Sequence, residues 1–271
     1  MATSWRPMGS LARASMDLIP VNRSANSGTG NLVAAECKRR DLLELSIGYG
    51  LILLAVWTPQ PWQRVFYWAG LTWVLLATGF SFDGWSAMGL RIAGSLRSLW
   101  VIGLALMLAA AAVCVAGRLH TLHLPEYPVL FVKRYWAYTI WAFLQEFLLM
   151  DFFLLRLLRL LPNKKTAVMA AACLFALAHL PNPILVPVTL LWGIVACLLF
   201  LQYRNLYTLG MAHAIFGICI ATTVPGPVDH NMRVGLGYLY YRPPAHHQRS
   251  QIDHIVSTHA CVIADAATRR C

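Results

Sequence analysis

The feature that most constrains this chain is the stretch from Tyr135 to Leu161, which is mostly apolar but carries Gln145, Glu146 and Asp151. A backbone can cross lipid only when its own hydrogen bonds close, which predicts a helix here. At 1.5 Å per residue, Glu146 lies roughly 16 Å from the start of this helix, near the middle of a ~30 Å hydrocarbon core. An ionisable residue at that depth is costly and indicates a functional site. The alternative is a neutral carboxylic acid that bonds to a neighbouring helix.

The composition extends this interpretation to the whole chain. Of its 271 residues, 58% are hydrophobic and only 12% are charged, about half the charged fraction of a soluble domain. We therefore expect a polytopic membrane protein with one helical core. The net charge of +11 fits basic loops beside anionic lipid. No nucleic-acid-binding motif is evident, so we expect no nucleic-acid partner. The seven cysteines contain no C-x-x-C pair and predict neither a disulfide framework nor a metal knot.

Apolar periodicity predicts an all-α fold, a polytopic transmembrane helix bundle of seven or possibly eight spans. The predicted spans are 42–58, 64–82, 99–117, 135–161, 166–180, 184–203 and 206–224. Around them we expect four parts: a disordered cytosolic tail at 1–40, N-terminal transmembrane helices at 41–127, a catalytic-type transmembrane core at 128–225, and a polar, His-rich tail at 226–271.

Basic residues on the loops predict the orientation of the bundle. If the N-terminus is cytosolic, one side carries Arg91, Arg97, Arg159, Lys164, Lys165 and Arg204. The opposite side carries fewer, namely Arg118, Lys133 and Arg134. This bias predicts that the N-terminus lies in the cytosol. We expect a multi-pass integral membrane protein of a bacterial inner or plasma membrane.

Three polar sites recur at intervals that suit one buried cluster. They are Glu146, then His179 at the end of the fifth span, then His213 in the seventh. Helix lengths permit all three to meet in the cytosolic half of the bilayer. A buried Glu can act as general base on a water, and two imidazoles can stabilise an oxyanion or hold a metal. These groups suit peptide-bond hydrolysis, although each His alone could be a helix-packing residue.

This order of residues resembles the CPBP (Abi) intramembrane endopeptidases, which are related to the type II CAAX prenyl proteases. Their motifs are Glu-Glu-x-x-x-Arg, Phe-x-x-x-His and His-x-x-x-Asn. Phe175 and His179 match the second motif, and His213 matches the start of the third. The resemblance covers roughly residues 130–225.

Three positions depart from the family pattern. Gln145 replaces the first Glu, Met150 replaces the Arg, and Gly217 replaces the Asn, while Glu146 matches the second Glu. Three outcomes stay open: Glu146 has become the base, with Gln145 orienting the substrate or the oxyanion; Asp151 contributes; or the chain is a catalytically degenerate member that acts as a membrane adaptor or scaffold. Asp151 points about 140° around an ideal helix from Glu146 and is not expected to take part. A transporter would need paired repeats, and none is evident.

The resemblance implies an intramembrane endopeptidase acting on a peptide or membrane-protein substrate in the lipid bilayer. We expect Glu146 to activate water and His179 and His213 to stabilise the transition state, with Gln145 and Phe175 in support. No cofactor is required in this scheme. The alternative is a zinc ion held by His179, His213 and Glu146.

A polar segment, Asp229–Tyr238, follows the last predicted span and is not explained by the family pattern. Two roles stay open for it. The segment either closes the site from the far side or only turns the chain.

Overall fold

The computed structural model describes residues 23–82, 84–91, 95–124 and 127–242, and all the regular structure in these ranges is helical. The chain divides into two units, residues 1–39 and 40–271, and the second contains the site. The helices are α1 (Arg23–Trp57), α2 (Trp62–Phe80), the 3₁₀ helix η1 (Ser95–Ser98), α3 (Leu99–Arg118), α4 (Pro128–Phe147), the π-helix η2 (Leu148–Leu154), α5 (Leu155–Leu160), α6 (Lys164–Leu177), α7 (Leu185–Tyr203), α8 (Leu206–Thr223), α9 (Gly226–Asp229) and α10 (Gly235–Leu239).

The all-α prediction is confirmed for the described residues, and each of the seven predicted apolar stretches coincides with helical structure. Among the described residues, three helices are long and apolar enough to cross a membrane by length and composition: Leu96–Arg118, Leu185–Tyr203 and Leu206–Thr223. Helix α1 begins at Arg23, inside the segment predicted as a tail. The rest of that tail, 1–22, and most of the C-terminal tail, 243–271, lie outside the described residues.

The stretch predicted as one α-helix from Tyr135 to Leu161 contains a change of helix type. Residues Leu148–Leu154 form a π-helix, and the N–H of Leu155 donates to the carbonyl of Met150, five residues earlier. A π-helix holds more residues per turn than an α-helix, so the segment after it is rotated relative to an ideal continuation. Such π segments are frequent at functional sites.

Asparagine side chains fix where three of the helices begin. Asn163 caps α6 by accepting from the backbone N–H of Thr166, and Asn205 caps α8 in the same way. Asn182 accepts from the first N–H groups of α7. Each cap satisfies backbone donors that no carbonyl of the same helix can reach. The short connections before α6, α7 and α8 are therefore defined locally by the sequence.

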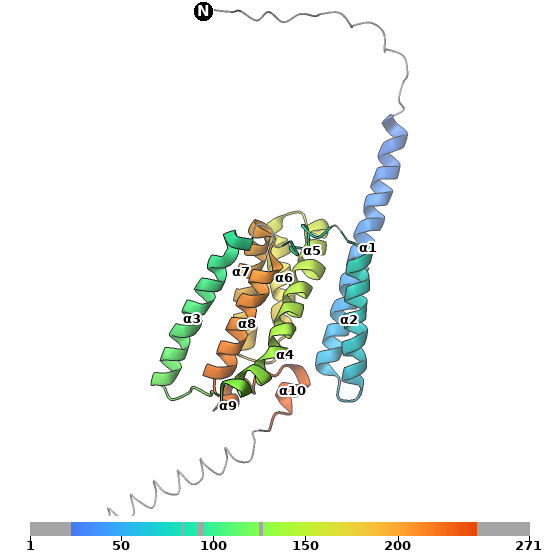
Figure 1. Cartoon of the computed structure of the whole chain (residues 1–271). Helices are drawn as coiled ribbons and strands as arrows, with labels where there is room; N and C mark the ends of the chain where they lie inside the picture. The colour runs from blue at the N-terminus through green and yellow to red at the C-terminus, as the bar shows by residue number, and fades with distance from the viewer. Residues whose placement is uncertain (1–22, 83, 92–94, 125–126, 243–271) are drawn as a thin grey trace, which may run out of the picture. The chain divides into compact units, whose positions relative to one another are not determined.

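Consecutive long helices run in alternating directions (Figure 1). Helix α4 packs against α8, α8 also packs against α3, and α6 packs against α7. The α4–α8 contact depends on two glycines of α8, because Gly210 faces the ring of Phe143 and Gly217 faces Tyr138. Small residues at helix contacts let backbones and rings approach closely inside a membrane. This contact brings α4, the carrier of Glu146, against the helix that carries His213.

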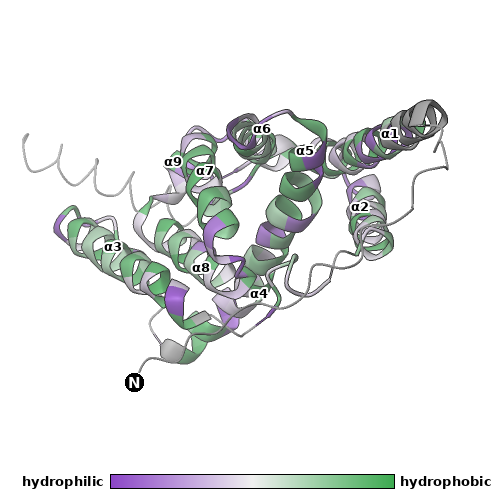
Figure 2. Ribbon diagram, turned by 90° about the horizontal axis from the view of Figure 1, so that it is seen from above, coloured by the Kyte–Doolittle hydropathy of each residue, from purple (hydrophilic) through white to green (hydrophobic). Residues whose placement is uncertain are grey.

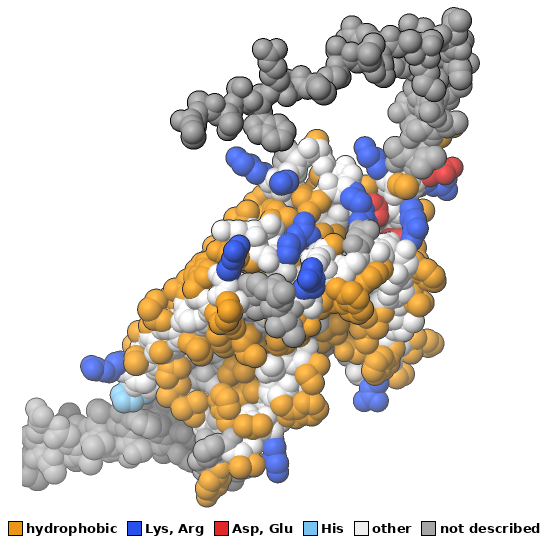
Figure 3. All heavy atoms as spheres, turned by 45° about the horizontal axis from the view of Figure 1, so that its top comes forward, with side chains coloured by type: hydrophobic (Ala, Val, Ile, Leu, Met, Phe, Trp, Pro, Cys, Tyr) orange, Lys and Arg blue, Asp and Glu red, His pale blue; other side chains and the backbone are white. Residues whose placement is uncertain are grey.

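The outer surface is strongly apolar, as expected of a surface that faces lipid. Figure 2 shows hydrophobic residues over most of the length of these helices. Large side chains such as Trp68, Met107 and Leu191 are more than half exposed. In Figure 3 the hydrophobic side chains cover much of the drawn face, and Lys and Arg gather toward its upper part.

A buried ion-pair cluster joins α1, α2 and α5. Arg156, which is 1% exposed, donates two hydrogen bonds to Oε2 of Glu44, at 2.9 and 2.8 Å. It also donates to the carbonyls of Ala77 and Phe152. Glu44 accepts from Arg40 through its other oxygen, at 2.7 Å. We call these residues the Glu44–Arg156 cluster; its charges are paired and its donors are bonded.

Candidate active site

A cavity of about 1020 Å³ lies among the helices, and most of its wall is apolar. It is bounded by residues of α1, α2, α3, α4, η2, α6, α7, α8 and α9 and of the segments that follow α6 and α9. The polar side chains that line it include Tyr49, Gln63, Arg134, Tyr138, Gln145, His179, Thr189, His213, Asp229 and Asn231. An apolar pocket with a few convergent polar groups is the usual form of a binding or active site.

Glu146, near the end of α4, is fully buried. Its Oε1 accepts hydrogen bonds from the indole N–H of Trp192 and from Nδ1 of His213, the latter at 2.8 Å. Its Oε2 is buried and has no partner among the described residues. Glu146 itself is not among the described residues that line the cavity, whereas Trp192 and His213 are. The Glu146 carboxylate is therefore linked to the cavity wall through its hydrogen bonds to these two side chains.

The hydrogen bonds also define the proton positions on the two predicted histidines. Nδ1 of His213 faces a carboxylate oxygen that already accepts from an indole, so Nδ1 carries the proton and Nε2 is an acceptor. Nδ1 of His179 lies 2.7 Å from the carbonyl oxygen of Phe175, which can only accept. The Nε2 atoms of both histidines are therefore unprotonated acceptors in the neutral state.

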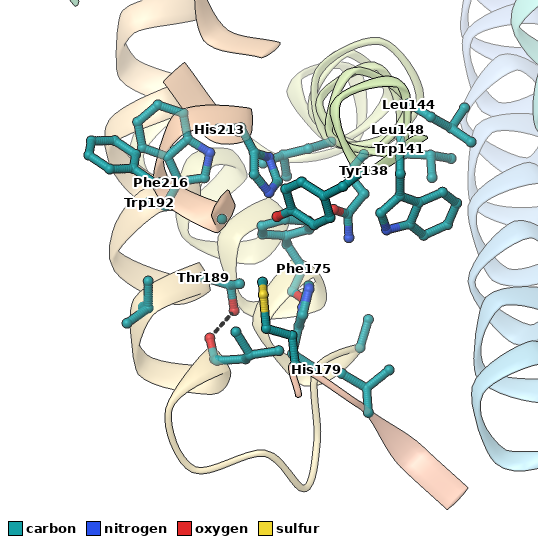
Figure 4. Close-up of a pocket in the computed structure, with 18 of the residues that line it drawn as sticks. Tyr138, Trp141, Leu144, Leu148, Phe175, His179, Thr189, Trp192, His213 and Phe216 are labelled. Atoms are coloured by element: carbon teal, nitrogen blue, oxygen red, sulfur yellow. Dashed lines mark hydrogen bonds between the residues drawn. The ribbon is translucent and has the colours of Figure 1, made fainter. Parts of the chain in front are cut away.

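Phe175 connects the two histidines. Its ring makes edge contacts with both, with centroid distances of 4.9 Å to His179 and 5.9 Å to His213. Figure 4 shows Phe175 between them, with Trp192 on the far side of His213. The structure thus brings Glu146 and His213 into direct contact and places His179 in the same cavity, held in position by the Phe175 ring and carbonyl.

The three positions that depart from the family pattern have different surroundings. Gln145 is half-buried and lines the cavity. Met150 is fully buried within the apolar core. A Cβ built at Gly217 would overlap the hydroxyl of Tyr138, so the phenol occupies the space beside this glycine. Figure 4 shows the Tyr138 ring beside His213 and Phe175.

Asp151 lies in the π-helix and is 2% exposed. Neither of its carboxylate oxygens has a hydrogen-bond partner in the described part of the chain. It is not among the described residues lining the cavity, in keeping with the expectation that it takes no part in the site.

Sequence reasoning missed Tyr138 and Trp192. Tyr138 lies in no motif, and nothing local distinguishes it from other aromatic residues of an apolar helix. Trp192 carried a weak indication, because it lies near the middle of α7, whereas membrane tryptophans usually gather at the interfaces. A buried indole N–H needs an acceptor, and in this chain the acceptor is Glu146.

The segment Asp229–Tyr238 forms part of the cavity wall. The side-chain amide of Asn182 donates to the backbone carbonyls of Asp229 and Arg233, at 2.7 and 3.1 Å. The N–H of Gly235 donates to the carbonyl of Leu180. Gly235 has φ +53°, and a Cβ there would overlap the carbonyl of Val56. Of the two roles that stayed open, closing the site is the one that these contacts favour.

Asp229 is the buried acid of this segment, at 1% exposed. Its Oδ1 accepts from the backbone N–H of Asn231 at 2.9 Å, while Oδ2 has no partner within the described ranges. Burial raises the pKa of Asp229 above its usual value, against the opposing effect of backbone hydrogen bonds from Asn231 and Met232.

The zinc alternative stays a prediction. Among the described residues there is no group of three or more His, Cys, Asp or Glu side chains placed to hold a metal ion. In this geometry Nδ1 of His213 is already bonded to Glu146. No step below is therefore routed through a metal.

Neither a curated protein nor a solved structure matches the chain. Residues 127–219 match the family model described as type II CAAX prenyl endopeptidase Rce1-like. The matched range begins beside α4 and ends within α8, so it contains Glu146, His179 and His213. This agrees with the resemblance drawn from the motifs. Over residues 127–219, about a third of its length, the chain is therefore similar to the Rce1-like type II CAAX prenyl endopeptidases.

Proposed function

We propose that this domain is an intramembrane endopeptidase, which hydrolyses a peptide bond of a membrane-associated substrate within a seven-span bundle. One observation carries the proposal. The buried Glu146 carboxylate is hydrogen-bonded to Nδ1 of His213, and His213 lines a large apolar cavity. Such a pair is the usual arrangement of a general base and the group that orients it.

In this proposal the water is activated by the pair rather than by Glu146 alone. The support is positional, because His213 lines the cavity and Glu146 does not do so in the described part of the chain. His213 takes a proton from water through Nε2, and the Glu146 carboxylate stabilises the imidazolium that forms. The water oxygen bonds to the substrate carbonyl carbon. When the C–N bond breaks, His213 returns the proton to the leaving nitrogen, which yields an acid and an amine.

His179 and Gln145 orient the reacting groups. The acceptor Nε2 of His179 holds a hydrogen of the water or a substrate N–H, and the ring is fixed by its bond to the Phe175 carbonyl. Gln145 lines the cavity with an amide that can both donate and accept. No metal is required in this scheme.

The alternative is a membrane adaptor that binds a substrate-like segment without cleaving it. The observation that favours it is Gln145, because an amide lines the cavity where the family pattern has a carboxylate. An adaptor would keep the apolar cavity for binding but would not hydrolyse a peptide bond.

The test is a cleavage assay with purified protein in lipid and a library of apolar, membrane-derived peptides, read by mass spectrometry. We expect discrete cleavage by the wild type, lost in His213→Ala and His179→Ala. The matched control is His123→Ala, which removes an exposed imidazole from the loop between α3 and α4. If the wild type binds peptides without cutting them and Gln145→Glu gains cleavage, the adaptor takes the place of the enzyme.

A further inference from the structure

Hydrolysis of an amide creates an oxyanion, which needs a hydrogen-bond donor inside the cavity. The groups that form the base do not supply one. His213 and His179 each use Nδ1–H in a bond to Glu146 and to the Phe175 carbonyl, and each leaves an acceptor Nε2. The indole N–H of Trp192 is also bonded to Glu146. A neutral donor must therefore come from another side chain of the cavity wall.

Tyr138 has a phenolic hydroxyl at the required place. It lies on α4 and lines the cavity, and it is only half-buried. Its hydroxyl occupies the space beside Gly217, which is one helical turn after His213 on α8. In Figure 4 the Tyr138 ring stands beside His213 and Phe175, at the centre of the labelled side chains. The hydroxyl is therefore near the imidazole that would receive the proton of the water.

The packing also holds this hydroxyl in place before substrate arrives. Gly217 has no Cβ, and any Cβ there would collide with the phenol, so ring and glycine fit each other. Gln145, one residue before Glu146 on α4, also lines the cavity and carries an N–H donor. However, no hydrogen bond to another described side chain is seen to fix its amide. Electrostatic stabilisation is effective when the donor is already oriented, which favours the phenol.

We propose that Tyr138 is the oxyanion-stabilising catalytic residue of this site, an inference that rests on the proposed hydrolysis. As water attacks, the new C–O bond forms and the carbonyl π electrons move to oxygen. The Tyr138 O–H donates a hydrogen bond to this oxyanion and keeps its proton. When the electrons return to re-form C=O, the C–N bond breaks and the nitrogen takes its proton from His213.

The first test removes one hydroxyl. Tyr138→Phe keeps the ring against Gly217, so we expect kcat to fall about 10²- to 10³-fold with little change in KM, as for loss of one oxyanion donor. The matched control is Tyr203→Phe at the end of α7. Its hydroxyl accepts from Trp100, and it is not among the described residues that line the cavity. Wild-type kcat in Tyr138→Phe would overturn the inference.

The second test displaces the Tyr138 hydroxyl without removing it. Gly217→Ala adds a Cβ in the space of the phenol, so the ring must shift. We expect the same loss of kcat as in Tyr138→Phe, and no further loss when the two changes are combined. Gly103→Ala is the control, because a Cβ at that glycine meets nothing within 4 Å. Losses that multiply in the double variant would contradict a shared cause.

A third measurement separates this inference from the proposed function. A peptide phosphonate, whose P–O⁻ imitates the oxyanion, is compared with its parent amide peptide by calorimetric Kd in lipid nanodiscs. We expect the wild type to prefer the phosphonate and Tyr138→Phe to lose that preference. If the wild type cleaves no peptide but shows this pattern, the endopeptidase fails and the Tyr138 donor stands. If it neither cleaves nor prefers the phosphonate, both fail.

Discussion

Two buried polar clusters of this chain can be compared directly, and they are built on opposite principles. In the Glu44–Arg156 cluster, both carboxylate oxygens of Glu44 accept from arginines, and Arg156 donates to backbone carbonyls as well. In the Glu146–His213 pair, Oε2 of the acid has no partner in the described part of the chain, and Nε2 of the imidazole belongs to a cavity wall.

The difference supports the proposal that the Glu44–Arg156 cluster serves stability and the Glu146–His213 pair serves chemistry. Buried charges are tolerated when every donor and acceptor is paired, and breaking such a set is costly. A buried group that lacks a partner in a native structure needs another explanation, and catalysis is a common one. Since both clusters contain a buried Glu, residue type alone does not distinguish them. The count of satisfied hydrogen bonds does.

The largest expected effect separates activity from stability at the pair. Glu146→Gln keeps the shape of the side chain, so we expect the free energy of unfolding to change by less than about 1 kcal/mol. The imidazolium of His213 loses its counter-charge, and we expect kcat to fall about 10⁴-fold, as when the acid of a catalytic triad becomes an amide. The measurements are peptide cleavage and thermal unfolding in the same detergent. If Glu146→Gln lowers the unfolding free energy by more than it raises the activation free energy of cleavage, the Glu146–His213 pair is structural, like the Glu44–Arg156 cluster.

The second effect breaks the structural cluster. Arg156→Met leaves Glu44 paired only with the exposed Arg40, and we expect a loss of about 3 kcal/mol of unfolding free energy. The matched control is Arg40→Met, which removes a solvent-exposed partner of the same carboxylate and is expected to cost below about 1 kcal/mol. Denaturant unfolding in detergent measures both. Equal costs for the two arginines would remove the distinction drawn above.

The smallest effect concerns Asp229, which has one bonded and one unbonded oxygen. Because burial raises its pKa in the folded state, the folded protein holds this proton more tightly than the unfolded chain. Stability therefore falls as pH rises from the unfolded pKa, about 3.9, through the folded one. Asn does not ionise, so over that pH range we expect the unfolding free energy of Asp229→Asn to increase relative to that of the wild type. Above the folded pKa the difference between the two proteins should stay constant. Melting temperatures of both proteins at a series of pH values test this, and a difference independent of pH would contradict it.

The helices were predictable because apolar runs in a membrane chain leave one backbone solution. The seven apolar stretches predicted from the sequence coincide with helical structure, because a helix satisfies the backbone hydrogen bonds within each stretch. The meeting of Glu146 and His213 was predictable as well, because a buried acid and a buried imidazole need each other in lipid.

The rest depends on tertiary contacts that leave no local pattern. Glu44 and Arg156 are far apart in the sequence, and the sequence alone did not reveal their pairing. The Tyr138 ring fits beside His213 only because residue 217 is a glycine. In the sequence, this glycine was interpreted as the loss of the motif's Asn. The direct assignment of Glu146 as base also came from the motif, whereas its position behind His213 follows from how α4 packs on α8.

The π-helix between Phe147 and Leu155 separates the two clusters along the chain, with Glu146 before it and Arg156 after it. The additional residue per π-helical turn sets the rotation of α5, which carries Arg156, relative to α4, which carries Glu146. Deleting one residue here would turn everything that follows by about 100° relative to the active-site side. The Glu146–His213 contact would stay, but Arg156 would lose its contact with Glu44. We therefore expect this segment to tolerate exchange of one apolar residue for another far better than a change in the number of its residues.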